Sequence, residues 1–230
     1  MAQAELGTVI VTGGSSGLGD AVTHAVHDAG GVPVVLDLDP PANAFPAHRV
    51  DLADTRAAEA AVDAVARERG AIRGVVTAAG IDACGQLADV DARAWERVVA
   101  VNLFGTAAVV RAALPHLERS EGRVITVAST LGLKAVSDAT AYCASKFGVV
   151  GFTRALAAET AGRVGVTLLI PGGMRTRFFD GRPDQYKPGA DARLADPSEI
   201  AQAVVFALSR PAGVELRELV MAVDTEPSWP

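Results

Sequence analysis

Two side chains that could move a proton together, Tyr142 and Lys146, stand four positions apart in the segment Tyr142-Cys143-Ala144-Ser145-Lys146. In a helix this spacing places both side chains on one face. A phenol has an ordinary pKa of about 10 and exchanges protons poorly at neutral pH, but a nearby cation favours the phenolate. We therefore expect Lys146 to bring the pKa of Tyr142 toward the working range of general acid–base chemistry. The alternative is a pair on the surface of an amphipathic helix.

A glycine run near the N-terminus, Thr12-Gly13-Gly14-Ser15-Ser16-Gly17-Leu18-Gly19, could bind phosphate groups. It follows the apolar run 8–11 and precedes a helix-like segment, 18–29. Glycine lets the backbone turn sharply, and the start of a helix offers free N–H groups and the positive end of the helix dipole. Strand, glycine turn and helix in this order predict a dinucleotide site. A tight turn that binds nothing is the alternative.

Short apolar runs alternate with helix-like segments along the whole chain. We predict strands at 8–11, 32–36, 49–50, 74–77, 123–127, 166–170 and 216–223, and helices at 18–29, 55–69, 91–117, 139–161 and from 197 onward. Unbroken apolar strands are typical of a parallel sheet that is covered on both faces. The pattern predicts a single α/β domain over residues 1–230, with a doubly wound, Rossmann-like parallel sheet.

Two stretches depart from this regularity. Between Asp37 and His48 three prolines exclude a full crossover helix, so the second and third strands should be joined by a loop. Residues 172–196 are rich in Gly, Pro, Arg and Asp, and we expect them to form a lid loop over the substrate.

Ser129 follows the predicted strand 123–127, where a hydroxyl could hold a substrate oxygen beside Tyr142. With this serine, the glycine run and the Tyr142–Lys146 pair, the sequence resembles the short-chain dehydrogenase/reductase family, in its smaller single-domain branch. The resemblance runs from about Thr8 to Val223. The glycine run matches the cofactor motif of the family, and four residues match its catalytic tetrad in order and spacing: Asn102, Ser129, Tyr142 and Lys146.

The resemblance implies a role for each of these residues. Tyr142 would be the general acid/base, Ser129 would orient the carbonyl or alcohol oxygen, and Lys146 would bind the nicotinamide ribose and lower the pKa of Tyr142. Asn102 would hold a water molecule in a proton relay that reaches Lys146. The implied cofactor-binding residues are Gly13, Ser15, Ser16, Gly17, Leu18, Gly19, Asp37, Asp51, Leu52, Ala78, Ala79, Gly80, Tyr142, Lys146, Pro171, Gly173 and Thr176.

Three segments differ from the family pattern or flank the expected cofactor. Thr77-Ala78-Ala79-Gly80 stands where the family usually has Asn-Asn-Ala-Gly, so its backbone contacts should remain without the bracing side chains. Pro171-Gly172-Gly173-Met174-Arg175-Thr176 would flank the nicotinamide, with Thr176 reaching the carboxamide. Met221-Ala222-Val223-Asp224-Thr225-Glu226 replaces the Val-Asp-Gly-Gly of many members.

Asp37 at the end of the second predicted strand bears on the choice of cofactor. A carboxylate there accepts hydrogen bonds from ribose hydroxyls and repels a 2′-phosphate. Leu38 follows it, and Arg49, the nearest cation, precedes Asp51, the expected contact on the adenine side. We predict NAD(H) over NADP(H). A turn or capping role before Pro40 is the alternative for Asp37.

Composition narrows the choice of partners. The formal net charge of −6 disfavours nucleic acid or an anionic membrane as the main partner. No uninterrupted apolar stretch is long enough to span a bilayer, and the first six residues do not resemble a secretory signal. Only two cysteines are present, and the four histidines form no recognisable ligand set, so we expect a cytoplasmic protein without a metal.

The predicted reaction is hydride exchange between a nicotinamide and a secondary alcohol or ketone, with a small-molecule substrate. The lid carries Arg177, Phe178, Phe179, Arg182 and Tyr186, which could suit an anionic substrate, although we favour solvated arginines. The resemblance implies a homotetramer or homodimer packed through the helices 91–117 and 139–161. Trp229 beside two prolines could dock on a neighbouring subunit or belong to a frayed tail.

Two other functions stay open at this point. One is a regulatory or binding protein that responds to a dinucleotide without turnover, against which the four tetrad residues count. The other is an epimerase or dehydratase with tightly bound NAD, against which the short chain counts, because it leaves no room for a separate sugar-binding domain.

Overall fold

The apolar runs form one seven-stranded parallel sheet in the computed structural model, which describes residues 5–39 and 45–229. The strand order is β3-β2-β1-β4-β5-β6-β7, and every neighbouring pair is parallel. The strands are β1 (Thr8–Thr12), β2 (Val32–Asp37), β3 (Ala47–Arg49), β4 (Ile72–Thr77), β5 (Arg123–Val127), β6 (Gly165–Pro171) and β7 (Glu218–Met221). The doubly wound α/β fold predicted from the sequence is confirmed.

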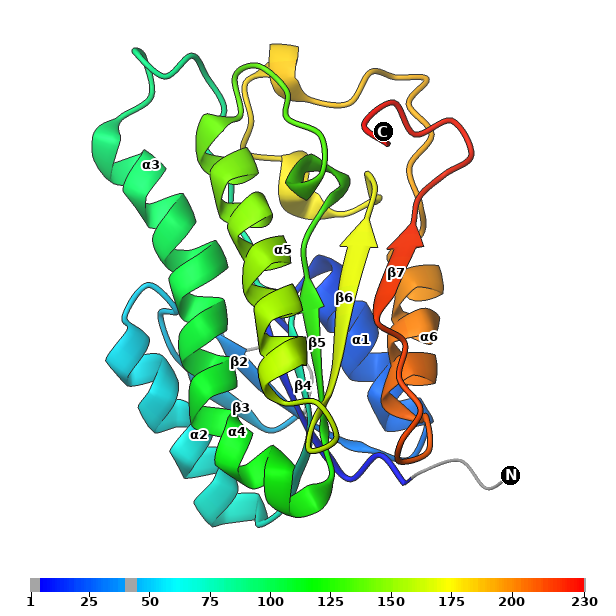
Figure 1. Cartoon of the computed structure of the whole chain (residues 1–230). Coiled ribbons are helices and arrows are strands. Elements are labelled where there is room, and N and C mark those ends of the chain that lie inside the picture. The colour runs from blue at the N-terminus through cyan, green and yellow to red at the C-terminus, as the bar shows by residue number, and fades with distance from the viewer. Residues whose placement is uncertain (1–4, 40–44, 230) are drawn as a thin grey trace.

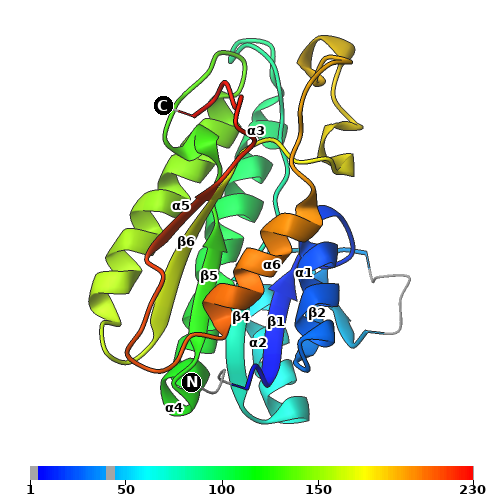
Figure 2. The same ribbon diagram turned by 90° about the vertical axis from the view of Figure 1, so that its right-hand side faces the viewer.

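Helices cover both faces of the sheet (Figures 1 and 2). They are α1 (Gly17–Asp28), α2 (Thr55–Arg69), α3 (Ala92–Val99), α4 (Thr106–Ser120), α5 (Thr140–Glu159) and α6 (Pro197–Leu208). Successive side chains of a strand point to opposite faces, so β1 serves two cores. Ile10 belongs to the core under α2 and α4, whereas Val9 and Val11 belong to the core under α1 and α6.

The element boundaries differ from the sequence prediction by a few residues, and one helix differs in kind. The predicted helix 91–117 is α3 followed by a π-helical segment, Ala100–Gly105, and then α4, which continues past Pro115 to Ser120. π-Helical turns of this kind often occur at functional sites. This one contains Asn102.

The same helical run, 92–120, is long and apolar enough to cross a membrane by length and composition. Half of its apolar window is buried inside the molecule. Its α4 part packs on α2 and β4, as expected for a core helix of a folded domain.

The connection from β2 to β3 was predicted to be a loop. Residues 40–44 of this connection lie outside the described residues. The described part shows β3 paired in parallel with β2, which places Asp37 beside Arg49 at the sheet edge.

Candidate active site

A pocket of about 840 Å³ lies at the carboxyl ends of the strands, where ligands bind in open α/β sheets. Most of the residues predicted for cofactor and catalysis line it: Gly13, Ser16, Gly17, Leu18, Asp37, Asp51, Leu52, Ala78, Ala79, Gly80, Ser129, Tyr142, Lys146, Pro171, Gly173 and Thr176. Three predicted residues, Ser15, Gly19 and Asn102, are not part of this lining.

The glycine turn packs so closely that side chains would not fit. Gly13 has a φ of +69°, and a Cβ there would lie 2.7 Å from the Ala79 Cα. A Cβ on Gly19 would lie 2.6 Å from the carbonyl carbon of Gly13. Gly19 therefore allows α1 to start directly against the turn. Within the described residues, the Ser16 side chain makes no capping hydrogen bond to α1. The first N–H groups of α1 thus remain available for an anion.

The turn after β4 is braced from β1. The Ala79 amide donates to the Thr12 Oγ1 over 3.2 Å. Thr77 stands where the family usually has its first asparagine, and its Oγ1 is buried without a hydrogen-bond partner in the described part of the chain. The close packing of Gly13 and the Thr12 bond hold this turn in the absence of the asparagine side chains.

The Asp37 carboxylate lies at the mouth of the pocket. Its Oδ2 accepts from the Ser15 amide at 3.0 Å and its Oδ1 from the Asp39 amide at 3.2 Å. The Ser15 amide therefore holds the Asp37 carboxylate in position, and Ser15 does not itself line the pocket. The Arg49 Nε donates instead to the Leu38 carbonyl at 3.0 Å, and Arg49 does not line the pocket.

Asp51, the other predicted acidic contact, also lines the pocket. Its carboxylate accepts from the Ala53 amide at 3.0 Å and from the Arg97 guanidinium at 3.0 Å. The Arg97 bond fixes the carboxylate orientation from α3.

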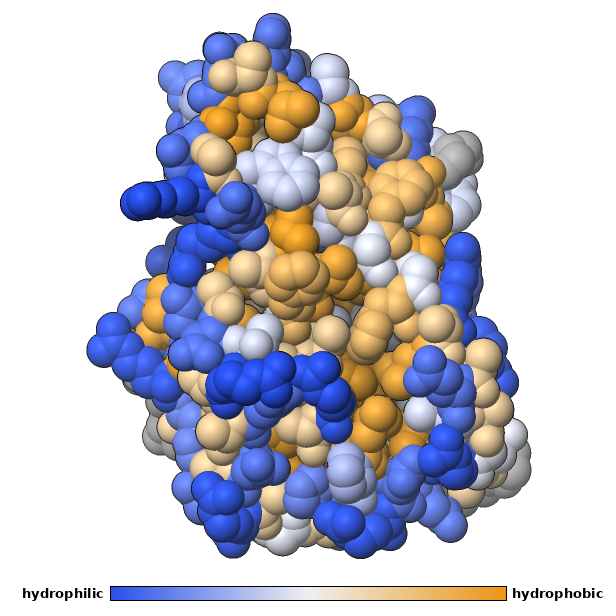
Figure 3. All heavy atoms as spheres, turned by 60° about the vertical axis from the view of Figure 1, so that its left-hand side comes forward, coloured by the Kyte–Doolittle hydropathy of each residue, from blue (hydrophilic) through white to orange (hydrophobic). Residues whose placement is uncertain are grey.

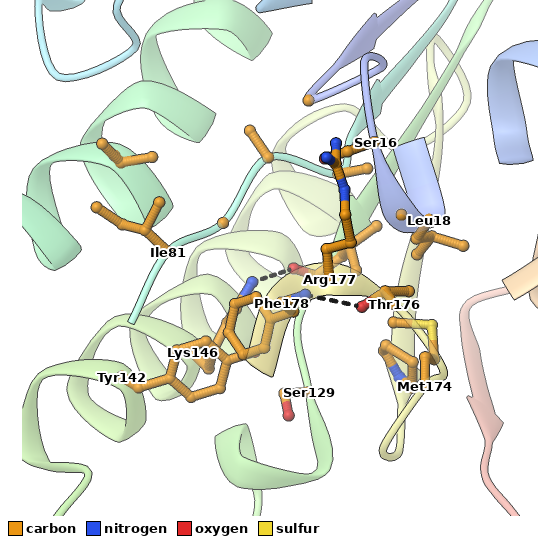
Figure 4. Close-up of a pocket in the computed structure, with 18 of the residues that line it drawn as sticks. Ser16, Leu18, Ile81, Ser129, Tyr142, Lys146, Met174, Thr176, Arg177 and Phe178 are labelled. Carbon is orange, nitrogen blue, oxygen red and sulfur yellow. Dashed lines mark hydrogen bonds between the residues drawn. The ribbon is translucent and has the colours of Figure 1, made fainter. Parts of the chain in front are cut away.

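Ser129, Tyr142 and Lys146 meet at the inner end of the pocket (Figure 4). Ser129 follows β5 and caps the 3₁₀ turn Thr130–Gly132, so its Oγ accepts from the Leu131 amide. Tyr142 and Lys146 both project from α5. The Lys146 Nζ lies 5.6 Å from the Tyr142 ring centroid and donates to the Val127 carbonyl at 2.9 Å.

The expected lowering of the Tyr142 pKa by Lys146 is wrong for this structure. Burial raises the pKa of Tyr142 to about 12, although an interaction with the Ser129 hydroxyl lowers it in part. Burial also lowers the pKa of Lys146 to about 8. Lys146 is not among the groups that shift the pKa of Tyr142: its ammonium donates to the Val127 carbonyl, and the loss of solvent around the phenol has the largest effect.

Asn102 braces the site from the π-helical segment. Its Oδ1 accepts from the Ile81 amide at 2.9 Å, and its Nδ2 donates to the Ile81 carbonyl at 2.9 Å and to the Ser145 Oγ at 3.0 Å. Both amide hydrogens are thus used to join the turn after β4 to α5. Gly80 lies between this brace and Lys146, since a Cβ there would be 3.6 Å from the lysine Nζ and 3.7 Å from the Asn102 Oδ1.

The lid is closed over the phenol. Phe178, from the 3₁₀ turn Arg177–Phe179, lies over Tyr142 with ring centroids 5.6 Å apart (Figure 4). The expectation of solvated lid arginines holds for Arg177, which is exposed, but is wrong for Arg182. The Arg182 guanidinium pairs with the Asp82 carboxylate at 2.6 Å and stacks on the two lid phenylalanines.

The C-terminal segment also reaches the pocket, which neither sequence expectation for the tail foresaw. Glu226 and Ser228 line the pocket. The Glu226 Oε2 accepts from the Gly173 amide at 2.9 Å, and the Ser228 Oγ lies 2.6 Å from the Thr130 Oγ1. Trp229 remains nearly half exposed.

Sequence reasoning therefore missed Asp82, the role of Arg182, and Glu226 with Ser228. Asp82 and Arg182 are 100 positions apart, and no local spacing links them. The tail offered one signal, the carboxylate of Glu226 in the segment that replaces the usual family ending and the hydroxyl of Ser228 just after it.

The chain is similar in sequence and in fold to known dehydrogenases. The family model described as short chain dehydrogenase matches residues 7–187. The chain is 34% identical to 2-(S)-hydroxypropyl-CoM dehydrogenase 3 of Xanthobacter autotrophicus, over 87% of this chain and 89% of that protein. It is 36% identical to D-threitol dehydrogenase of Mycolicibacterium smegmatis, over 87% and 85%. Ligand-free aldohexose dehydrogenase of Thermoplasma acidophilum superposes with a TM-score of 0.88 at 26% identity, over 99% and 96% of the two chains.

Proposed function

The chain belongs to the short chain dehydrogenase family, and from this premise we propose an NAD(H)-dependent oxidoreductase that interconverts a secondary alcohol and a ketone. One observation carries the proposal. Ser129, Tyr142 and Lys146 line the same pocket as the glycine turn and the Asp37 carboxylate. A proton-transfer group and a dinucleotide cradle in one cavity support alcohol chemistry with a nicotinamide cofactor.

The residues present fit the cofactor. The sharp glycine turn, in which Gly13 and Gly17 have positive φ, and the free N–H groups of α1 suit a pyrophosphate, and Asp37 suits the ribose hydroxyls. The Arg177 side chain extends from the lid toward Ser16 (Figure 4), where its cation would face the pyrophosphate. When bound, the nicotinamide supplies the hydride acceptor or donor. The contacts of Asp51, Leu52, Ala78 and Thr176 with the cofactor are part of this proposal.

The side chains of this chain supply the positioning and the proton. The Ser129 hydroxyl holds the substrate oxygen, and the Tyr142 phenol donates its proton to a ketone oxygen or accepts one from an alcohol. A phenol with a pKa of about 12 is protonated at neutral pH and is ready to act as an acid. Alcohol oxidation needs the phenolate, so we expect the positive charge of an oxidised nicotinamide to lower the pKa of Tyr142.

Lys146 and Asn102 act around the phenol. The Lys146 ammonium lies beside the Tyr142 ring and is free to exchange its Val127 bond for a ribose hydroxyl. Asn102 fixes the turn after β4 against α5, and the relay water predicted for it would have to use the remaining lone pair of its Oδ1 or its backbone.

A fluorescence titration with NADH and NADPH tests the cofactor assignment. Wild-type protein should bind NADH more tightly than NADPH, and Asp37→Ala should reduce the preference about tenfold or more, because the repulsion of the 2′-phosphate and the ribose hydrogen bonds are lost. Asp39→Ala is the matched control, since Asp39 lines the same mouth but its carboxylate accepts none of the hydrogen bonds found in the described part of the chain.

The other outcomes separate the alternatives. Tighter binding of NADPH by the wild type would contradict the role of Asp37. Tight binding of NADH without turnover of any alcohol or ketone would favour the regulatory protein. Cofactor that stays bound through dialysis would favour the epimerase or dehydratase.

The α3–α4–α5 face supports the proposed assembly of identical subunits. Figure 3 shows apolar surface across this face, and Phe104 and Phe147 are each about half exposed there. Large exposed apolar patches mark interaction sites. We propose that two copies pack through this face in a homodimer or homotetramer in the cytoplasm. Sedimentation should give a species larger than the 23.6 kDa monomer, and a monomer would contradict the packing.

A further inference from the structure

The C-terminal segment 221–229 turns back over the carboxyl ends of β6 and β7 and closes one side of the pocket (Figure 1). It is tied to both segments that flank the reaction centre. Glu226 binds the Gly173 amide after β6, and Ser228 binds Thr130, which adjoins Ser129. The Lys134 Nζ also donates to the Pro227 carbonyl at 3.0 Å. These contacts place the segment at the end of the pocket that holds Ser129, beside the segment that follows β6.

The Glu226 carboxylate has acceptor capacity left for a ligand. Its Oε2 accepts from the Gly173 amide, and its Oε1 accepts from the amide and the hydroxyl of Ser228. A carboxylate offers about four lone-pair sites, so at least one remains. The hydrogen bonds from Ser228 and Gly173 outweigh the opposing effect of burial and lower the pKa of Glu226, which keeps the group ionised at neutral pH.

No cation that lines this end of the described pocket is free to offset the charge of Glu226, and Lys134, which donates to the Pro227 carbonyl, lies outside the lining. Arg182 is already paired with Asp82 at 2.6 Å and stacked on the lid phenylalanines. Lys146 is buried and bonded to Val127, and Arg177 extends toward Ser16 at the cofactor end. An anionic substrate group near Glu226 would meet a like charge, whereas a hydroxyl group would meet an acceptor.

Building on the proposed dehydrogenase function, we propose that Glu226 determines substrate class by accepting a hydrogen bond from a second hydroxyl of the substrate. The substrates are neutral diols or polyols, and hydroxy acids are rejected by the charge of the carboxylate. Glu226 is a specificity-determining residue in this account, and Ser228 is a positioning residue that holds the segment on Thr130.

Steady-state oxidation of three matched compounds tests this assignment: butane-2,3-diol with two hydroxyls, butan-2-ol with one, and 3-hydroxybutanoate with a carboxylate. The wild type should show the highest kcat/KM for the diol and the lowest for the hydroxy acid. Glu226→Gln should shrink the ratio of diol to hydroxy acid by about ten- to a hundredfold, because a charge-assisted hydrogen bond and a repulsion are lost together.

Two further variants separate charge from structure. Asp224→Asn removes a neighbouring tail carboxylate that pairs with Arg193 at the surface, and it should leave all three kcat/KM values unchanged. Ser228→Ala keeps the carboxylate but removes the hydroxyl that bonds Glu226 and Thr130, so the ratio of diol to hydroxy acid should fall part of the way toward that of Glu226→Gln. NADH affinity, measured in parallel, should be unchanged in Asp224→Asn, and in the other two variants it reports any shift of Gly173, whose amide Glu226 holds.

The outcomes are distinguishable from failure of the proposed function. A wild type that binds NADH but oxidises none of the compounds overturns the dehydrogenase proposal, and this inference falls with it. A wild type that oxidises butan-2-ol or 3-hydroxybutanoate better than the diol overturns this inference alone. A ratio of kcat/KM for diol to hydroxy acid that is unchanged in Glu226→Gln also overturns this inference alone.

Discussion

The Asp82–Arg182 ion pair should hold the lid closed over Tyr142. It joins the turn after β4 to the lid, with side chains that are 6% and 18% exposed. Charges about 4 Å apart attract by roughly 4 kcal/mol at an effective dielectric constant of 20. Desolvation and ordering of the side chains offset much of this attraction, so we expect a net coupling of about 1–2 kcal/mol.

A double-mutant cycle with Asp82→Asn and Arg182→Gln measures this coupling. Chymotrypsin is a suitable probe, because Phe178, Phe179 and Tyr186 in the lid are half-buried, and we expect cleavage beside them to become faster when the lid opens. When opening is fast relative to cleavage, the cleavage rate follows the population of the open form. Each single variant should therefore be cleaved about five- to thirtyfold faster than the wild type, and the double variant should be little faster than either.

Asp184→Asn is the matched control within the same lid. Asp184 pairs with Lys187 at 2.8 Å but is almost fully exposed, and such surface pairs contribute little. Cleavage of this variant should match the wild type. Additive effects of Asp82→Asn and Arg182→Gln, or unchanged cleavage in both, would show that the ion pair does not hold the lid.

Two further predictions concern the phenol and the glycine turn. Tyr186→Phe leaves Tyr142 as the only tyrosine, and ultraviolet titration should then show ionisation near pH 12 without cofactor and at lower pH with NAD⁺. Since the pKa of Tyr142 is raised in the folded state, the contribution of this group to stability is lost as the pH rises from about 10 to 12. Ionisation near neutral pH without cofactor would contradict the effect of burial. Gly19→Ala should lower the free energy of unfolding by about 3 kcal/mol and abolish NADH binding, because its Cβ meets the Gly13 backbone. The control Gly189→Ala, away from the proposed subunit interface, meets no described atom within 4 Å and should be neutral or slightly stabilising in thermal unfolding. Equal melting temperatures for the two variants would refute the packing argument.

The fold could be predicted because local signals agreed with one another. Apolar runs such as 8–11 and 123–127 became buried strands, and the glycine run fixed the first turn. Ser129, Tyr142 and Lys146 were found because two of them share a helix face and the third follows a strand.

The features that could not be predicted from the sequence depend on contacts between distant parts of the chain. The π-helical segment at Asn102 has no Pro or Gly signal in front of it, and its reason is the brace to Ile81 and Ser145. The pKa of Tyr142 depends on how deeply the phenol is buried, which spacing to Lys146 does not reveal. The fold of the tail follows from its bonds to Thr130 and Gly173, which lie far away in the sequence.

Proton transfer by Tyr142 is tested by comparing wild-type protein with Tyr142→Phe in two measurements on the same preparation, NADH affinity and turnover of a secondary alcohol. The phenyl ring that replaces the phenol keeps the packing on Phe178 but has no hydroxyl proton to transfer. We predict NADH affinities that agree within about twofold and a loss of turnover of about a hundred- to ten-thousandfold. Turnover that persists within tenfold of the wild type would contradict proton transfer by Tyr142.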